Sequence, residues 1–112
     1  MLSIQIHRKE KMTLTRLHHF IALGQSGKKS DIDQLMHFLE AQDDLATSKL
    51  VDYALSHVST REGVERLRHY LFQGLRSQRN YAALYFKRRG FADTLAEALA
   101  QGKIDWDQGF SE

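Results

Sequence analysis

The apolar residues of this chain follow a helical pattern almost throughout. From residue 14 onward they recur at three- and four-residue spacings, and short polar or glycine-containing stretches separate the runs. The pattern predicts six short amphipathic helices, with inward-facing residues that include Leu17, Leu35, Val51, Leu67, Leu84 and Leu95. We therefore expect an all-α fold, either a short right-handed α-α solenoid or a helical bundle of five or six helices.

Residues typical of helix ends separate these runs. Polar side chains that cap helix starts precede several runs, and glycine, which commonly ends a helix, follows several. The predicted starts are at Ser30 or Asp31, Asp43–Asp44, Ser59 with Glu62 as a capping box, Ser77 and Asp93. The predicted stops are at Gly24, Gly74, Gly90 and Gly102.

The first residues follow a different pattern. Residues 2–7 alternate apolar and polar side chains, which is typical of a strand, and no other segment offers a matching strand. Residues 1–12 are therefore interpreted as an N-terminal extension: a lone strand, a strand that pairs with a second copy, a disordered stretch, or residues that precede a true start at Met12. The remaining chain divides into a helical repeat domain over 13–102 and an acidic tail over 103–112.

One octet of residues recurs four times. Its copies are LTRLHHFI at 14–21, IDQLMHFL at 32–39, VERLRHYL at 64–71 and, in weaker form, ADTLAEAL at 92–99. The first, fourth and eighth positions are apolar, and three copies carry an aromatic residue at the seventh. This arrangement predicts one apolar stripe with an aromatic shoulder on each of four helices.

The spacing of the octets predicts how the helices are grouped. The second, third and fourth copies start 32 and 28 residues apart, which leaves room for one more helix in each interval. Two-helix units of this length stack as solenoids, because each unit buries its apolar face against its neighbour. The first interval, 18 residues, is too short for a second helix. The helix over 14–21 is therefore expected to pack directly on the next one as a cap.

One segment resembles a known repeat. Arg79 is followed by alanines three and four residues later, by Phe86, and by a glycine eleven residues later. This pattern resembles the second helix of HEAT-like repeats, in particular the short type found in phycobilisome lyases, although Phe86 replaces the usual aliphatic residue. The preceding loop, residues 73–77, lacks the Asp and Pro that are usual there. The resemblance is good over 62–90 and faint over 31–58, and it implies a helical-repeat architecture without indicating one function.

Charge alternates in blocks along the chain. The net charge is +5 over residues 1–30, −5 over 31–58, +6 over 61–90 and −4 over 91–112, within a total of +2. Blocks of opposite sign can neutralise one another inside the fold or across a dimer. The alternative is that the basic blocks form a surface for nucleic acid or another anion.

The basic segment 61–90 supplies the candidate binding residues. Cations lie on or beside the predicted fifth helix, interleaved with Tyr81, Tyr85 and Phe86, and this composition suits single-stranded nucleic acid. The candidates for anion or nucleic-acid binding are Arg76, Arg79, Lys87, Arg88 and Arg89. The alternative is that the last three stabilise the end of their helix, where cations are favourable, while the aromatic residues belong to the core.

The chain shows little chemistry of the kinds that enzymes use. It has no cysteine, and its six histidines lack the spacing of a helical zinc site. It has no glycine-rich phosphate loop and no nucleophile elbow. Asp43 and Asp44 are explained more simply as a helix cap. We therefore expect no enzyme activity, no metal and no cofactor.

The leading functional hypothesis is a non-enzymatic protein-interaction or scaffold module. Two and a half repeats make a small core, which favours a homodimer. Trp106 and Phe110 in the acidic tail are candidate docking residues for a partner, unless they fold back over the last helix. The alternative is a nucleic-acid-binding or regulatory protein that uses the basic segment. No apolar run is long enough to span a membrane, and the expected location is the cytoplasm.

Overall fold

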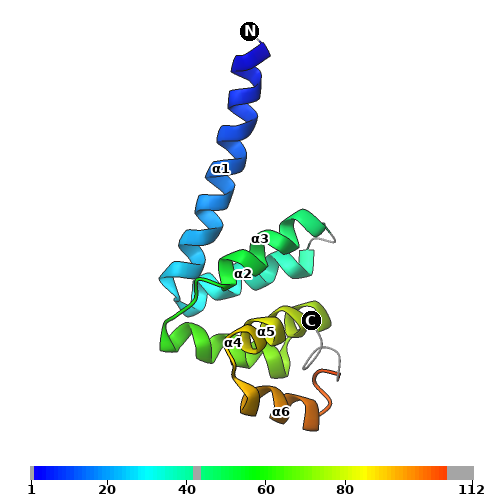
Figure 1. Ribbon diagram of the computed structural model, residues 1–112. Coiled ribbons are helices and arrows are strands. Elements are labelled where there is room, and N and C mark those ends of the chain that lie inside the picture. The colour runs from blue at the N-terminus through cyan, green and yellow to red at the C-terminus, as the bar shows by residue number, and fades with distance from the viewer. Residues whose placement is uncertain (1, 42–43, 106–112) are drawn as a thin grey trace.

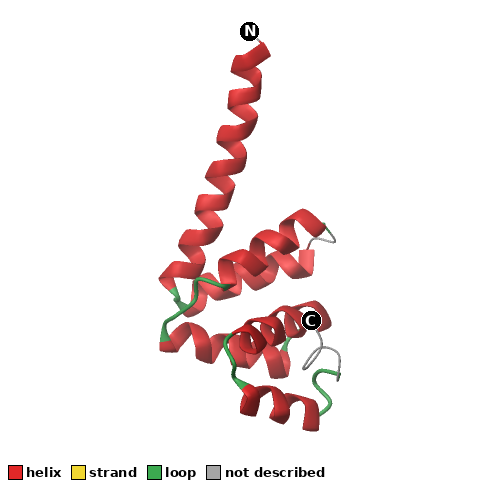
Figure 2. Ribbon diagram, in the orientation of Figure 1, coloured by secondary structure: helices red, strands yellow, loops and turns green. Residues whose placement is uncertain are grey.

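The chain folds into helices joined by short loops (Figures 1 and 2). The computed structural model describes the backbone of residues 2–41 and 44–105 and the side chains of 14–40 and 44–105. Helix is the only regular secondary structure within these ranges. The helices are α1 (Leu2–Ser26), α2 (Lys29–Ala41), α3 (Leu45–Leu55), α4 (Arg61–Gln73), α5 (Arg76–Arg88) and α6 (Ala92–Ala100). The predicted all-α fold class is confirmed.

The helices stack in pairs. Helix α2 packs against α3, and α4 packs against α5, so each pair forms a helical hairpin. The second hairpin lies on the first through contacts of α4 and α5 with α2. Helix α1 packs on both helices of the first hairpin, and α6 packs on both helices of the second. This arrangement agrees with the two-helix units, and with the direct packing of α1 on α2, that the octet spacing predicts.

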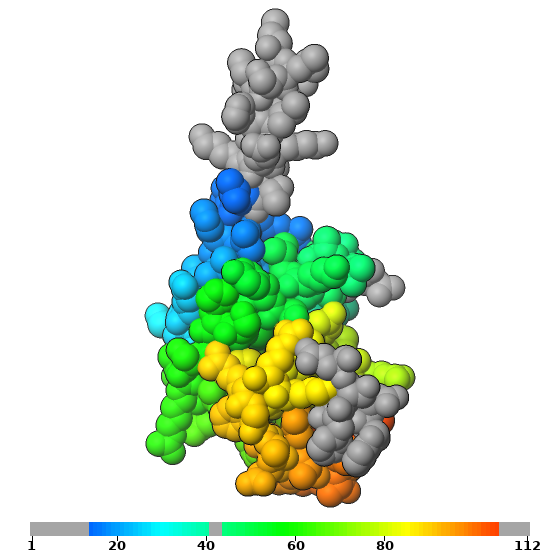
Figure 3. Space-filling view, in the orientation of Figure 1, coloured from blue at the N-terminus to red at the C-terminus, as the bar shows by residue number. Residues whose placement is uncertain are grey.

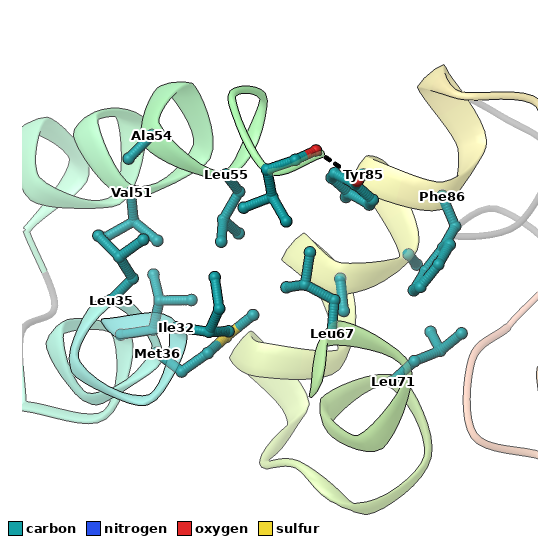
Figure 4. Packing of buried hydrophobic residues seen from close by; sticks show 14 of the residues in the cluster. Ile32, Leu35, Met36, Val51, Ala54, Leu55, Leu67, Leu71, Tyr85 and Phe86 are labelled. Atoms are coloured by element: carbon teal, nitrogen blue, oxygen red, sulfur yellow. Dashed lines mark hydrogen bonds between the residues drawn. The ribbon is translucent and has the colours of Figure 1, made fainter. Parts of the chain in front are cut away.

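One continuous apolar interior joins the two hairpins (Figure 4). Ile32, Leu35 and Met36 of α2 and Leu67 and Leu71 of α4 have no exposed surface. Residues of α3 and α5 close the same interior from the other side, including Val51, Leu55, Ala82, Ala83 and Phe86. Burying a side chain of this size stabilises the fold by about 1.5–3 kcal/mol.

Two buried polar groups hold the hairpins together through single hydrogen bonds. The hydroxyl of Tyr85 donates to the backbone oxygen of Val58 at 2.8 Å, a bond drawn as the dashed line in Figure 4. The amide of Gln78 donates to the backbone oxygen of Met36 at 3.1 Å. Because an unpaired buried polar group is costly, these bonds fix the register of α5 against α2 and against the loop that follows α3.

The predicted strand at the N-terminus is wrong. Helix α1 begins at Leu2 and continues to Ser26, so residues 2–7 are helical. The helix also passes through Gly24, which was predicted to end it. The turn comes instead at Gly27, which has a φ of 62°. Gly24 has a different role: a Cβ there would overlap the backbone oxygen of Ala54, so glycine at 24 lets α1 and α3 approach closely.

Several predicted caps lie one or two residues from the observed ones. Helix α4 is capped by Thr60, not Ser59, and its hydroxyl accepts a hydrogen bond from the backbone N–H of Gly63 at 3.0 Å. The N-cap of α5 is Leu75, not Ser77, and that of α6 is Phe91, not Asp93. Asp44 caps α3 as predicted.

Among the predicted inward-facing residues, Leu17 and Leu84 are exceptions. Both are half-buried, whereas Leu35 and Leu67 are fully buried. The neighbouring Tyr85 and Phe86 take the interior positions of α5 instead.

None of the described helices combines the length and the apolar character that crossing a bilayer requires.

Candidate interaction surfaces

Three arginines of the basic segment are used inside the fold. Arg66 Nε donates to Asp33 Oδ1 at 2.6 Å, and Arg68 donates to Glu97 Oε2 at 2.7 Å. Arg88 Nη1 lies 2.9 Å from both carboxylate oxygens of Asp52. Each pair joins the basic block to one of the two flanking acidic blocks. The interpretation that the charge blocks neutralise one another inside the fold is therefore correct for these residues.

The remaining candidates of the basic segment are divided between two places. Arg89 lies at the C-terminal end of α5, where it donates to the backbone oxygen of Ser56 at 2.8 Å and stacks over the ring of Tyr85. The Nζ of Lys87 is buried. The five candidates thus do not form one continuous surface, because Arg76 and Arg79 lie at the opposite end of the helix.

Arg76 and Arg79 line a shallow depression that we call the basic notch. Its other lining residues come from the loop after α6: Gly102, Lys103, Ile104 and Asp105. The notch has a volume of about 260 Å³. Ile104 is 4% exposed and anchors the loop in the core. Lys103, distant in sequence from the predicted candidates, is thereby brought to the same place.

A second surface is apolar and lies on α1 and α3. We call it the apolar face and define it by Leu14, Leu17 and Ile21 of α1 with Leu50 and Tyr53 of α3. Leu14 is 51% exposed and Tyr53 is 52% exposed, while the other three are half-buried. Isolated exposed leucines are ordinary, but a cluster on adjacent helices marks an interaction site.

The packing of α1 on α3 places these residues together. Arg16 of α1 donates to the hydroxyl of Thr47 at 2.8 Å, and Gly24 lies against Ala54 eight residues further along. The two helices therefore run in the same direction, and helical periodicity puts Leu17 and Ile21 on the outer side of the contact, beside Leu50 and Tyr53. In Figure 3 the blue side chains of α1 and the green side chains of α3 lie next to each other on the face in view.

The apolar face arises because α1 buries a different side of the octet. In α2 and α4, the fourth and eighth positions, such as Leu67 and Leu71, are fully or almost fully buried. In α1 the residue at the seventh octet position, Phe20, is buried instead. It packs against Phe38, with the two ring centroids 4.7 Å apart. The first, fourth and eighth positions of this copy, which are apolar in sequence, are left exposed or half-buried.

A third feature is a charged cluster between α2 and α4. Asp33 Oδ1 accepts hydrogen bonds from Arg66 Nε and from the hydroxyl of Tyr70, at 2.6 and 2.7 Å. Partial burial raises the pKa of Asp33, but the hydrogen bonds from Arg66 and Tyr70 and the charge of Arg66 outweigh it and hold this pKa below its usual value. Burial, followed by the bond to Asp33 and its charge, raises the pKa of Tyr70 to about 12.

The histidines do not converge on a metal site in the part of the chain with described side chains. His19 and His37, which share an octet position, line one shallow depression between α1 and α2, together with Asp33. His69, which occupies the same position of the third copy, is exposed on α4. Among the described residues, no group of three histidine or carboxylate side chains is placed to hold a metal ion.

Trp106 and Phe110, the candidate docking residues of the tail, lie outside the described residues. Among the residues of these candidate surfaces, Lys103 and Tyr53 had no predicted role, and the aliphatic residues of the apolar face were predicted to lie on inward stripes. Local pattern cannot find Lys103, because only the return of the chain after α6 brings it to α5. The signal for Tyr53 is a large aromatic residue on the polar side of its helix.

Comparison with protein-family models, with curated proteins and with solved structures finds no match to this chain. The HEAT-like resemblance therefore remains a prediction that rests on the residues of 62–90.

Proposed function

We propose that this protein is a non-enzymatic protein-interaction module that docks through the apolar face, and that its partner is a second copy of the same chain. The observation that carries the proposal is that the apolar stripe of the first octet is left exposed at Leu14 and only half-buried at Leu17 and Ile21. The same three positions are buried in the second octet, and the fourth and eighth are buried in the third. A helix that keeps a core-like stripe on its outer side needs another apolar surface to cover it.

A second copy fits this stripe because the stripe is self-complementary when two α1 helices pack antiparallel. If two α1 helices cross antiparallel with the two-fold axis between residues 17 and 18, Leu14 of one copy lies opposite Ile21 of the other. Such a contact is isologous, as in most homodimers. Tyr53 at the edge of the face would add an aromatic contact. Aromatic residues are among those enriched at interfaces.

The charges of α1 agree with this antiparallel register. Arg8, Lys9 and Lys11 precede the stripe, whereas residues 24–27 after it carry no charge. An antiparallel pair sets the basic run of each copy against the uncharged residues of the other. A parallel pair would place the two basic runs side by side and would be disfavoured by repulsion.

The length of α1 supports an interface along this helix. The molecule measures 58 × 26 × 23 Å, and its long dimension follows α1, which extends beyond the hairpins (Figure 1). Its 25 residues correspond to about 37 Å of helix. A helix that extends alone into water is only marginally stable, so a partner that packs along it would stabilise it.

The proposal is tested by the mass of the chain in solution. Light scattering at tens of micromolar should give twice the 13.0 kDa chain mass. Leu14→Lys places a charge opposite the Ile21 of the other copy and should give a monomer with unchanged helix content, because Leu14 is 51% exposed within one copy.

The matched control is Leu75→Lys. Leu75 is 55% exposed and lies at the start of α5, away from the apolar face. This variant should remain a dimer. A wild-type chain that stays monomeric, or a Leu75→Lys variant that dissociates as readily as Leu14→Lys, contradicts the proposal.

The alternative, nucleic-acid binding by the basic segment 61–90, remains a prediction. Fewer cations of this segment are available for it than the sequence suggests. Arg66, Arg68 and Arg88 are paired with carboxylates. The test is a binding titration with single-stranded nucleic acid at increasing salt, because phosphate-driven affinity falls steeply with ionic strength. A cytoplasmic location also remains our expectation.

A further inference from the structure

The basic notch on the second hairpin has a separate use from the apolar face. Arg76 and Arg79 approach it from the first turn of α5, and Lys103 approaches it from the loop after α6. Asp105 is the one carboxylate among its lining residues. Three cations and one anion therefore share a depression that is large enough for a single small charged group.

Among the residues with described side chains, these cations lack the carboxylate partners that Arg66, Arg68 and Arg88 have. Within the residues whose side chains are described, no carboxylate forms an ion pair with Arg76, Arg79 or Lys103. The Nε of Arg79 is buried and has no hydrogen-bond partner there. Guanidinium and ammonium groups that have no carboxylate partner favour the binding of an external anion.

The helix end adds to the positive potential. Arg76 and Arg79 lie where α5 begins, and the first turn of α5 contains no acidic residue. The N-terminal end of a helix carries a partial positive charge and favours anions, so two arginines there oppose the dipole. Lys87 and Arg88, in contrast, lie in the last turn, where the dipole stabilises cations. Helix stability therefore explains why cations occupy the last turn of α5, but it does not explain the arginines in the first turn.

We propose that the basic notch binds the phosphate group of a phosphorylated serine or threonine side chain in a partner protein. Arginine forms paired, charge-assisted hydrogen bonds with phosphate oxygens, and clusters of arginine are a recurring means of recognising phosphorylated peptides. A phosphorylated side chain carries a charge of about −1.5 to −2 at neutral pH, which matches the excess of cations in the notch.

The surroundings of the notch favour a single phosphate over a nucleic-acid strand. A strand needs a row of cations to follow its backbone, but Arg88 and Arg89 further along α5 are engaged with Asp52 and Ser56. Asp105 in the same depression opposes every bound phosphate, so the local excess of cations suffices for one phosphate group and not for several. An isolated phosphate on a peptide does not need the row of cations.

This inference does not rest on dimerisation, because the notch and the apolar face lie on different hairpins. It can be tested by nuclear magnetic resonance on the full ¹⁵N-labelled chain. The probe is a blocked pentapeptide of glycine and alanine with a central phosphoserine, compared with the same peptide carrying serine. We expect saturable shifts of the amides of residues 76–79 and 102–103 with the phosphorylated peptide only. The same titration of the Leu14→Lys variant should give the same result whether or not the wild type dimerises.

The variants that test the assignment are Arg79→Gln and Lys103→Gln. Each removes a charge-assisted hydrogen bond and should weaken the peptide about tenfold or more. The matched control, Arg61→Gln, removes an exposed arginine that pairs only with Glu65 of its own helix among the described residues, and should leave binding unchanged. The dispersion of the same spectra reports whether each variant is folded.

A pH series adds a readout that a structural effect would not produce. Affinity should rise between about pH 5 and 7, as the phosphate loses its second proton near pH 6. The proposal is overturned if the phosphorylated peptide causes no saturable shifts at the notch, or if Arg79→Gln and Lys103→Gln bind it as the wild type does. It is equally overturned if a short single-stranded oligonucleotide saturates the same amides at lower concentration than the peptide.

Discussion

Asp33 joins two hairpins through one carboxylate oxygen. Arg66 and Tyr70, both on α4, donate to Oδ1 of this residue on α2, and the guanidinium of Arg66 also lies over the ring of Tyr70 at 5.2 Å. The three groups form one electrostatic unit, because each charge or hydrogen bond changes the protonation energy of the others. The titration of Tyr70 therefore reports directly on this unit.

Tyr70 should titrate far above the ordinary range. Burial, the hydrogen bond to Asp33 and the Asp33 charge raise its pKa from 10.0 to about 12. Its contribution to stability is fully present below pH 10, the unfolded value, and is lost as the pH rises toward 12. The measurement is phenolate absorbance against pH, with Tyr70→Phe to identify the late step.

The carboxylate contribution to that shift can be separated by a matched pair of variants. Asp33→Asn removes the charge and should move the pKa of Tyr70 back toward its ordinary value, whereas Glu65→Gln, on the exposed side of α4, should not. An unchanged Tyr70 titration in Asp33→Asn would show that burial alone produces the shift.

At the scale of the helices, most elements could be predicted because the necessary information is local. The spacing of Ile32, Leu35 and Leu39 indicates α2 and its buried face without reference to the rest of the chain. Caps were less accurate, since Ser59 and Thr60 are both good capping residues and local sequence does not choose between them.

Helix α1 shows what local sequence does not contain. Its octet resembles those of α2 and α4, yet it buries Phe20 and Leu23 and leaves Leu14 outside. The helices α2 and α4 have neighbours on two sides, whereas α1 has the first hairpin on one side and no described neighbour on the other. Which apolar positions become core therefore depends on the number of neighbours. For a similar reason, Arg76 and Arg79 could be named as candidates from the sequence, but the arrival of Lys103 beside them could not be predicted.

The close approach of α1 and α3 depends on Gly24. Gly24→Ala adds a methyl group that overlaps the backbone oxygen of Ala54, so we expect a loss of about 3 kcal/mol in the free energy of unfolding. Alanine is a better helix former than glycine by about 1 kcal/mol. A loss of stability in Gly24→Ala can therefore come only from the overlap with α3. Urea denaturation followed by circular dichroism measures it. Gln25→Ala, at the exposed neighbouring position, should change stability by less than about 0.5 kcal/mol.

The antiparallel register of the proposed dimer can be tested by cross-linking. The chain has no cysteine, so a single introduced thiol can pair only with the same position of another copy. His18→Cys lies next to the proposed two-fold axis and should form a disulfide-linked dimer readily under mild oxidation. His69→Cys is equally exposed on α4 and should not. Equal cross-linking of the two variants would indicate random collision and exclude this register.

Across the whole molecule, the charge blocks connect helices that are distant in sequence. Arg66, Arg68 and Arg88 reach Asp33, Glu97 and Asp52, so one basic block links both hairpins and α6. Pairs with this degree of exposure contribute little individually, up to about 1 kcal/mol. Their combined role is to favour one arrangement of the helices over others with the same apolar pattern.

This network makes stability depend on pH at the acid end. The pKa of Asp33 lies below its ordinary value of 3.8, so its contribution is present above that value and is lost as the pH falls through the lowered pKa. Asp33→Asn should therefore be less stable than the wild type by about 1 kcal/mol at neutral pH. The difference should vanish under strongly acidic conditions. Urea midpoints measured across the acid range test this prediction, and a difference that persists unchanged would assign the loss to packing instead of charge.

The extension of α1 beyond the hairpins also affects how the molecule moves through solvent. Its radius of gyration is 15.5 Å, compared with about 13 Å for a spherical domain of this length. Frictional drag grows with such elongation, so a single copy should diffuse slowly and elute early from a sizing column, as a heavier globule would. The apparent mass from an elution volume would therefore overestimate the number of chains in the particle. Tumbling times would likewise exceed those of a compact 13.0 kDa sphere even without self-association.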